Sequence, residues 1–475
     1  MFWPVPPLAL PDSAPWELPS EKLQAIVYFK EESHALVEQV LHLYSQGFSN
    51  IRLIDNNSQQ HELPVTILKA FEKQGVVTLK KDYRVRGQKR AYMTHFQYLR
   101  RYSDWIMPVD ADEFPRTTKF ASLLNYLVLK DDEICTIAIP MMFFGSSDRA
   151  EQPNSILQGF THRRNFEKRD EPILGYKTIS RPRCALWTAI HHTAVPPSLK
   201  DRSYNSHHGF TRERQPKTDG SDEQDFPDAV VNHYRTQSEH YYRNNKLVRG
   251  SAISNKKHPR TMQNYHEDNK LDNELEDRQA ATSAQQRFPA LYRDKSLVLK
   301  SNQDLNNPWP LENAVEALEQ LARHQGLCIL DASIHGGFPE YQFGKVLRNS
   351  ALLDPTWDCI VRVPPGYVKT IVGSGLTKLC ATKEKIQDQD FERFVESTVK
   401  EYSQRYSAFV AMDSNVLLNP GSDTAQLRED AKQLDGTSEI KWKDWIPKDQ
   451  SYLESGVVRL VPKSFTATSQ SVLSR

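Results

Sequence analysis

The chain has 475 residues, of which 38% are hydrophobic and 25% are charged, and its formal net charge is +1 at pH 7. This length allows about two or three domains, each with its own core. Because the net charge is close to zero, we do not expect the chain as a whole to attract nucleic acid or an anionic membrane. The sequence contains no run of about 18 apolar residues, so it predicts no membrane span.

The first 21 residues form a proline-rich lead without a basic start, so they do not predict a signal peptide. The cysteines are scattered and form no C-x-x-C pair; they are Cys135, Cys184, Cys328, Cys359 and Cys380. We therefore expect reduced, buried thiols and neither a disulfide frame nor a zinc site. The simplest expectation is a cytoplasmic protein that is at most peripheral to a membrane.

Strands and helices alternate through the first hundred residues. Apolar runs suited to buried strands begin at four places, near residues 25, 51, 76 and 105. Amphipathic helical spacing fills the intervals, over 34–46, 61–74 and 88–102. This alternation predicts a parallel, doubly wound α/β sheet, and such sheets bind ligands beyond the carboxyl ends of their strands. Because Glu32, Asp55 and Asp110 stand at those ends, we expect them to face one crevice.

The fourth run ends in an acidic segment, Asp110-Ala111-Asp112-Glu113. Residues two apart in a strand point the same way, so the carboxylates of Asp110 and Asp112 are expected to aim at one point beyond the strand end. Mg²⁺ or Mn²⁺ prefers such oxygen ligands, usually with phosphate completing the shell. The alternative is a solvated turn that caps a helix at 118–129.

The rest of the chain predicts further elements and a second domain. We expect a strand at 134–140, an apolar turn at 141–147, a β-hairpin at 173–192, a long loop at 196–228, a strand at 230–234 and a helix at 238–249. The hydrophilic stretch 253–295 predicts a partly helical connector. A smaller α/β or α+β domain is expected over 296–475, with strands at 327–330, 359–363, 408–412 and 457–461 and a helix at 391–406. Its role stays open.

Several blocks of sequence carry a family resemblance. The segment FKEESHALVEQVLHLYSQGFSNIRLIDNNS resembles the opening of family 2 type glycosyltransferases, particularly the branch related to family 92. The later blocks follow in that family's order: Trp105 to Phe114, Phe144 to Ser147, Lys177 with Arg181 and Pro182 before His191 or His192, and Asn232 to Ser238 followed by Lys246, Arg249 and Gly250. The resemblance covers about residues 22–252. It departs at Lys30-Glu31-Glu32, where the family usually has an asparagine before its glutamate.

The resemblance implies a GT-A type, Rossmann-like fold for the domain over 22–252. It implies transfer of a sugar from a nucleotide-diphosphate sugar, with a UDP-sugar favoured, to a hydroxyl of a glycan or lipid-linked acceptor, with inversion. A bound Mn²⁺ or Mg²⁺ would clamp the leaving diphosphate. The implied metal ligands are Asp110, Asp112 and His233. For His233, a strand histidine bonded to a backbone group is the alternative.

The resemblance also implies donor-binding residues. They are Glu32, Asp55, Asn57, Lys89, Arg181, Lys246 and Arg249. Glu32 and Asp55 are expected to hold the base and ribose, with helix capping as the alternative, and the cations are expected to meet phosphate.

Other roles stay open in the sequence. The catalytic base is Glu113, Asp148 or Glu151, because an inverting transfer needs a carboxylate within reach of the acceptor hydroxyl. His191 and His192 are weaker metal candidates that would otherwise contact donor or acceptor. A nucleotidyltransferase is a second hypothesis, and a catalytically silent glycan- or nucleotide-binding module is a third.

Overall fold

The computed structural model describes residues 22–58, 64–84, 87–118, 120, 122–130, 133–165, 175–205, 227–249, 260–293, 298–299, 309–322, 326–331, 357–363, 381–384, 393–395, 397–398, 408–412, 441–445 and 456–461. The chain divides into two compact units, and the first contains the described parts of Glu21–Thr118 and Asp131–Leu321. The second contains those of Lys119–Lys130 and Ala322–Arg475. The proline-rich lead and most of the 391–406 helix lie outside the described residues.

A large sheet forms the centre of the first unit. Its strands are β1 (Leu23–Phe29), β2 (Phe48–Asp55), β3 (Val77–Lys81), β4 (Trp105–Asp110), β5 (Glu113–Thr117), β6 (Thr136–Phe143), β9 (Tyr176–Ser180), β12 (Ser203–Asn205) and β13 (Ala229–His233). They run in the order β3-β2-β1-β4-β9-β6-β13-β5, and β12 pairs with β6. The four strands expected first in the chain are parallel neighbours, so the prediction of a mostly parallel α/β sheet is confirmed.

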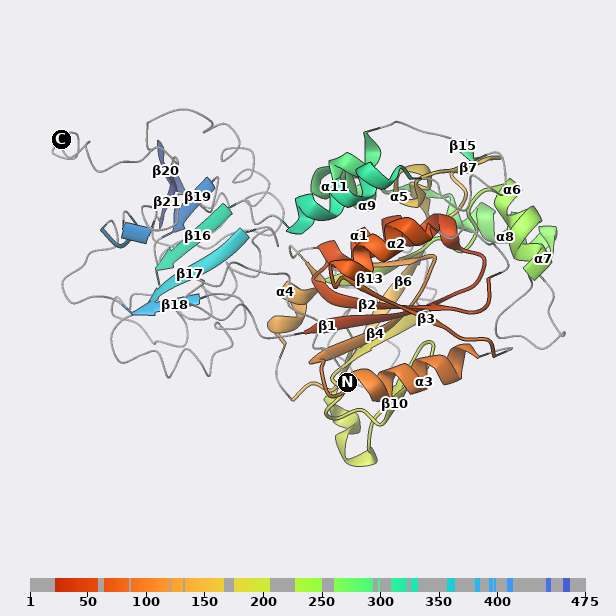
Figure 1. The fold of residues 1–475 in the computed structure, drawn as a ribbon, viewed down its shortest axis with the longest axis horizontal. Helices are drawn as coiled ribbons and strands as arrows, with labels where there is room; N and C mark the ends of the chain where they lie inside the picture. The colour runs from red at the N-terminus through yellow and green to blue at the C-terminus, as the bar shows by residue number, and fades with distance from the viewer. Residues whose placement is uncertain are drawn as a thin grey trace, which may run out of the picture. The chain divides into compact units, whose positions relative to one another are not determined.

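Helices cover both faces of this sheet. Figure 1 shows α1 (Ser33–Ser45) and α2 (Val65–Lys73) on one face and α3 (Gln88–Leu99) on the other. The inner side of α3 places Tyr92 and Phe96 against Ile26 and Ile106 of the strands, all of them buried. Burial of this apolar surface stabilises the layered arrangement.

Strand direction determines which side chains meet at each edge of the sheet. β9 runs antiparallel to both β4 and β6, β13 is parallel to β6, and β5 is antiparallel to β13. The carboxyl ends of β1, β2, β3, β4, β6 and β13 therefore share one edge, which we call the carboxyl edge. The amino ends of β9 and β5 lie at this same edge.

The predicted hairpin at 173–192 is wrong. β9 is instead a central strand between β4 and β6, with residues 177–180 all buried. Only the short strands β10 (Trp187–Thr188) and β11 (Thr193–Ala194) pair with each other. Residues 177–180 are buried whichever face of the sheet they point to, so burial in β9 does not alternate as it does in a half-exposed hairpin.

The acidic segment is a tight connection between two strands. Only Ala111 and Asp112 separate β4 from β5. β5 continues as a fully paired neighbour of β13, with Glu113 opposite His233. The turn therefore joins a central strand to the last strand in the sheet order, and the sheet curls so that Asp110 and Glu113 meet.

Further short elements complete the first unit. They are β7 (Gln152–Pro153), α5 (Ile156–Gly159), β8 (His162–Arg163), η1 (Pro197–Arg202), α6 (Glu239–Tyr241), η2 (Tyr242–Lys246), α7 (Leu247–Arg249), α8 (Met262–Asp272), β14 (Leu275–Glu276), α9 (Gln279–Arg287), η3 (Pro289–Tyr292), β15 (Val298–Leu299) and α11 (Leu311–Ala322). Residues 260–293, expected as part of a connector, pack within this unit. Arg163 bonds Asp277, Tyr292 bonds Glu38, and Phe288 and Leu291 are buried, so polar pairs and apolar contacts both hold this segment. None of the helices in the described residues is long and apolar enough to cross a membrane.

The second unit has its own mixed sheet. Its strands are β16 (Gly326–Asp331), β17 (Trp357–Val363), β18 (Ala381–Glu384), β19 (Ala408–Met412), β20 (Lys441–Trp445) and β21 (Gly456–Val461). The order is β18-β17-β16-β19-β21-β20, with β21 and β20 antiparallel to their neighbours. Helix α4 (Leu123–Val128) falls in the same unit. A second, smaller domain of α/β or α+β type was expected, and this sheet agrees with it; the expected start at residue 296 stays a prediction.

A disulfide joins Cys135 and Cys184, so the expectation of reduced cysteines is wrong for this pair. Cys135 precedes β6 and Cys184 follows β9. Because these strands are antiparallel neighbours with Thr136 opposite Ser180, the two cysteines are brought to a Cα separation of 5.7 Å. Disulfides persist in oxidising compartments, and the bridge does not agree with the expected cytoplasmic location.

Removing this bridge should destabilise the protein. The cysteines are 49 residues apart, and closing a loop of that length contributes about 3–4 kcal/mol by restricting the unfolded chain. We expect the double variant Cys135→Ala, Cys184→Ala to unfold at lower urea concentration than the oxidised wild type. Dithiothreitol should lower the midpoint of the wild type and leave that of the variant unchanged. Equal sensitivity of both proteins to the reductant would contradict the pairing.

Candidate active site

Several charged residues lie together at the carboxyl edge. Asp110 ends β4, His233 ends β13, Glu113 begins β5 and Lys177 lies at the start of β9. The edge also holds every non-glycine residue of positive φ in the described chain: Glu31, Asn57, Ser147, Asp148 and Gln237. Each follows the end of β1, β2, β6 or β13 by a few residues. Such conformations cost about 1 kcal/mol each and collect at functional sites, which sets this edge apart from the rest of the sheet.

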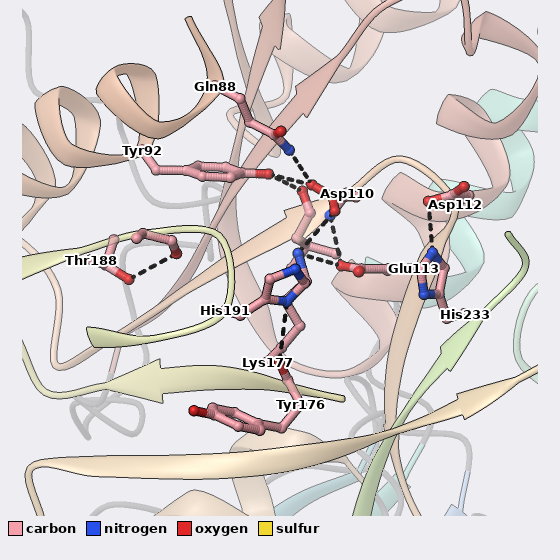
Figure 2. Close-up of polar contacts among 12 residues, drawn as sticks. Gln88, Tyr92, Asp110, Asp112, Glu113, Tyr176, Lys177, Thr188, His191 and His233 are labelled. Carbon is pink, nitrogen blue, oxygen red and sulfur yellow. Dashed lines mark hydrogen bonds and ion pairs between the residues drawn. The ribbon is translucent and has the colours of Figure 1, made fainter. Parts of the chain in front are cut away.

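Asp110 is held by donors on both of its carboxylate oxygens (Figure 2). Oδ1 accepts hydrogen bonds of 2.7 Å from the Gln88 amide and the Tyr92 hydroxyl, both on α3. Oδ2 accepts one of 3.0 Å from Lys177. Burial disfavours the charged carboxylate, but the charge of Lys177 together with the hydrogen bonds from Tyr92 and Lys177 outweighs this and lowers the pKa of Asp110. Asp110 is therefore an ionised, oriented acceptor.

Lys177 is fully buried and bridges two carboxylates. Its ammonium lies 3.0 Å from both Asp110 Oδ2 and Glu113 Oε2. Glu113 is also fully buried, and its Oε2 accepts the backbone N–H of Asp110 at 2.8 Å. The Gln39 amide of α1 donates to the carbonyl oxygens of Asp110 and Glu113. The turn between β4 and β5 is thus held by Gln39 of α1 and by Lys177 of β9.

Burial, and then the negative charge of Asp110, raises the pKa of Glu113 to about 7 from its ordinary value of 4.5. Because the carboxyl is harder to ionise in the folded chain than in the unfolded chain, the folded state loses stability as the pH rises from about 4.5 to about 7. Glu113→Gln removes this titration and keeps an oxygen acceptor for Lys177.

The stability of the Glu113→Gln variant relative to wild type should therefore rise by about 3 kcal/mol between pH 4.5 and pH 7.5. Urea unfolding at the two pH values, followed by tryptophan fluorescence, measures this difference. Glu267→Gln, an exposed change on α8, should show no such trend. A stability difference between the Glu113 variant and wild type that stays constant with pH would contradict the raised pKa.

Asp112 lies in a separate cluster with Lys246 and His233. Its Oδ2 accepts a 2.8 Å hydrogen bond from Lys246, and its Oδ1 lies 3.5 Å from Nε2 of His233. Lys246 is buried and ends η2, a π-helical turn, and it also donates to the carbonyl of Arg235. Burial alone would raise the pKa of Asp112, but Lys246 and then His233 hold it well below its usual value.

The expectation that Asp110 and Asp112 aim at one point does not hold in this structure. The strand ends at Asp110, and Asp112 belongs to the turn, so the alternation of a strand no longer applies. The two carboxylates have no partner in common among the described residues, and Figure 2 shows them directed at different groups.

A divalent cation fits Asp112 and His233 better than it fits Asp110. Among the described residues no group of three His, Cys, Asp or Glu side chains could hold a metal. Mg²⁺ and Mn²⁺ often take one or two protein ligands and complete their shell with water and substrate phosphate. Oδ1 of Asp112 and Nε2 of His233 lie close enough to share one such ion, whereas both oxygens of Asp110 already accept hydrogen bonds.

His191 also lies beside the acidic segment (Figure 2). Its Nδ1 is 3.3 Å from the carbonyl oxygen of Tyr176, and the hydroxyl of Thr178 donates to the carbonyl oxygen of His191. Burial, and then the positive charge of Lys177, lowers the pKa of His191 to about 4. The imidazole is therefore neutral at pH 7. His192 is turned to the ring of Trp187, at 5.4 Å.

The expected base- and ribose-binding residues lie at the carboxyl edge. Glu32 is buried at the N-cap position of α1, where its side chain makes no capping bond. Asp55 ends β2 and accepts the backbone N–H of Ser58 at 2.9 Å. Asn57 is exposed, with φ of 54°. All three residues lie at the carboxyl edge because β1 and β2 are parallel and end there.

The cations expected to bind phosphate do not all lie at the carboxyl edge. Lys246 is in the site, and Lys89 is exposed beside Gln88, with its ammonium 5.7 Å from the centre of the Trp187 ring. Arg181 lies over the Trp105 ring at the opposite end of β4 from Asp110, because β9 runs antiparallel to β4. The structure thus places Arg181 away from the carboxyl edge. The side chain of Arg249 lies outside the described residues.

The three base candidates differ in exposure. Glu113 is completely buried. Asp148 is exposed after the turn that follows β6, and its Oδ1 accepts a 3.2 Å hydrogen bond from Asn273. Glu151 is exposed, and its Oε2 lies 3.7 Å from Nδ1 of His240. Only Asp148 and Glu151 can meet an acceptor without a rearrangement of the core.

Sequence reasoning missed four residues that position the acidic segment: Gln39, Gln88, Tyr92 and Lys177. Lys177 had a signal, because it begins the Lys-x-x-x-Arg-Pro block of the family resemblance. The other three are helix residues whose roles depend on how α1 and α3 cross the strand ends, and a single sequence carries no mark of that contact.

Comparisons with known proteins give only distant structural likenesses. No family model and no curated protein matches the sequence. TarS 1-349 of S. aureus in complex with UDP is 12% identical, with a TM-score of 0.23, over 34% of this chain and 47% of that chain. A putative glucose-1-phosphate thymidylyltransferase from Bacillus anthracis in complex with a sucrose is 11% identical, with a TM-score of 0.21, over 34% of this chain and 72% of that chain. The chain thus spans about half the length of the TarS fragment, and TM-scores this low carry no argument about its activity.

Proposed function

We propose that this chain is a glycosyltransferase that moves a sugar from a nucleotide-diphosphate sugar, with UDP-sugar favoured, to a hydroxyl of a glycan or lipid-linked saccharide. The single observation that carries the proposal is the Asp112, His233 and Lys246 cluster at the carboxyl edge. Asp112 comes from one block and His233 and Lys246 from another that lies far from it in the sequence, and each block resembles the same family. A surface-polysaccharide or lipid-linked precursor is the acceptor class that we favour.

The cluster suits a diphosphate leaving group. Negative charge develops on the diphosphate as the glycosidic bond breaks, so fixed positive groups near it stabilise the transition state. Asp112 and His233 would hold a Mn²⁺ or Mg²⁺, and when bound that ion supplies Lewis-acid stabilisation of the diphosphate. Lys246 holds Asp112 by Oδ2, which leaves Oδ1 on the His233 side.

Other residues of the edge would orient the donor. Asp110 is ionised and immobilised by three donors, and its side chain is 23% exposed, so it can still accept from a hydroxyl. Glu32 and Asp55 would hold the nucleoside. Asp148 or Glu151 would take the proton of the acceptor hydroxyl, because the buried Glu113 cannot touch it.

A thermal-shift screen tests the binding half of this proposal. A ligand that binds only the native state raises its melting temperature. UDP should raise the melting temperature more in the presence of Mn²⁺ than in its absence, and more than CMP or AMP does. No shift with any nucleoside diphosphate, with or without Mn²⁺, would remove the proposal.

A further inference from the structure

The acidic segment contains an internal cation. Lys177 has no exposed surface, and its ammonium lies 3.0 Å from a carboxylate oxygen of Asp110 and 3.0 Å from one of Glu113. It comes from β9, whereas the two carboxylates come from β4 and β5. The ammonium therefore occupies the point where β4 and β5 present two carboxyl groups to each other.

This position is one that a metal ion would otherwise favour. Two buried carboxylates that face one point attract a cation strongly, because the surrounding medium screens their charge poorly. Ca²⁺, Mg²⁺ and Mn²⁺ all prefer carboxylate oxygens. With the ammonium in place, Asp110 Oδ2 and Glu113 Oε2 are already compensated and hydrogen-bonded.

Asp112, the remaining carboxylate of the acidic segment, has different neighbours. Lys246 donates to Oδ2 of Asp112, and Oδ1 faces the ring of His233 at 3.5 Å. A cation that approaches the turn thus meets one oxygen of Asp112 with an imidazole nitrogen beside it. Both oxygens of the other carboxylate, Asp110, already accept hydrogen bonds. The two lysines divide the acidic segment into unlike halves.

We propose that Lys177 is a positioning residue that serves as a built-in counter-ion: it orients Asp110 as a hydrogen-bond acceptor and keeps divalent cations out of the Asp110–Glu113 half. The cation is thereby directed to Asp112 and His233. The choice of Asp112 and His233 as the metal side rests on the proposed function, whereas the exclusion of metal by Lys177 does not. A purely structural role for Lys177 would affect stability without changing metal binding.

Binding of Mn²⁺ alone tests this inference. In Lys177→Met the ammonium is lost and the two carboxylates are left facing each other, so Mn²⁺ should enter. At a Mn²⁺ concentration about 100 times its dissociation constant, the melting temperature of the variant should rise by about 5 °C more than that of the wild type. Adding Glu113→Gln to the variant should abolish the extra rise. Equal Mn²⁺-induced shifts in wild type and Lys177→Met would overturn the proposal.

Two controls keep the result interpretable. Lys69→Met, an exposed change on α2, should leave the Mn²⁺ shift of the wild type unaltered. If Lys177→Met does not fold, Lys177→Gln removes the charge while its amide can still donate to Asp110, and the same extra shift is expected. No nucleotide is present in these measurements. A wild type that fails to bind UDP would therefore remove the proposed function and leave this test intact.

Discussion

Replacing Asp112 by asparagine should lower kcat/KM for the UDP-sugar by about 100- to 1000-fold. Asparagine lacks the negative charge that would hold the cation, and the diphosphate then loses its electrostatic stabilisation as it leaves. The fold should persist, because asparagine has nearly the same shape and its oxygen can still accept from Lys246. Steady-state kinetics and a thermal melt of the same preparation measure the two effects.

A matched control lies at the other end of β4. Asp104 is exposed just before the amino end of β4, away from the carboxyl edge, and accepts the backbone N–H of Lys22. Asp104→Asn should keep wild-type kinetics. The role given to Asp112 would be contradicted if the Asp112→Asn protein were unfolded, or if it were folded and fully active.

Replacing Lys246 by methionine should lower the free energy of unfolding by about 3 kcal/mol at pH 7. Lys246 and Asp112 are both largely buried, so removing the cation leaves the carboxylate without its counter-charge. The low folded-state pKa of Asp112 contributes stability that is present above about pH 4 and lost as the pH falls. In the variant Lys246 no longer holds this pKa down, so the buried carboxyl becomes neutral at a higher pH than in the wild type, and the penalty should shrink as the pH falls below about 4.

Urea unfolding of Lys246→Met at pH 7 and at pH 3.5 or so checks both the size and the pH dependence of this loss. Lys270→Met, an exposed change on α8, is the control and should stay within about 0.5 kcal/mol of wild type. The ion-pair account fails if the Lys246 variant loses the same stability at both pH values.

The sequence was sufficient for the parallel half of the sheet. β1 to β4 and α1 to α3 follow each other with local hydrophobic periodicity, so each element could be predicted from its own residues. β5 and β9 could not, because their positions depend on pairing with strands that are distant in the chain. The same long-range pairing of β6 with β9 brings Cys135 to Cys184, and no spacing in the sequence marks it.

The candidate site was predictable where a residue's position depends on the end of its own strand. Asp110, Asp112 and His233 lie at the carboxyl edge for that reason. Lys177 and Arg181 show the limit. They are four residues apart, about 13 Å along a strand, and only strand direction decides which of them reaches Asp110. The antiparallel course of β9 selects Lys177, and the sequence contained no sign of that direction.

The release of UDP from a panel of UDP-sugars with Mn²⁺ tests the central claim most directly. We predict that the wild-type protein releases UDP from at least one of them, faster with a saccharide acceptor present, and that Asp112→Asn does not. Release from none of the panel, or equal release by the wild type and the Asp112 variant, would contradict a glycosyltransferase that acts through this site.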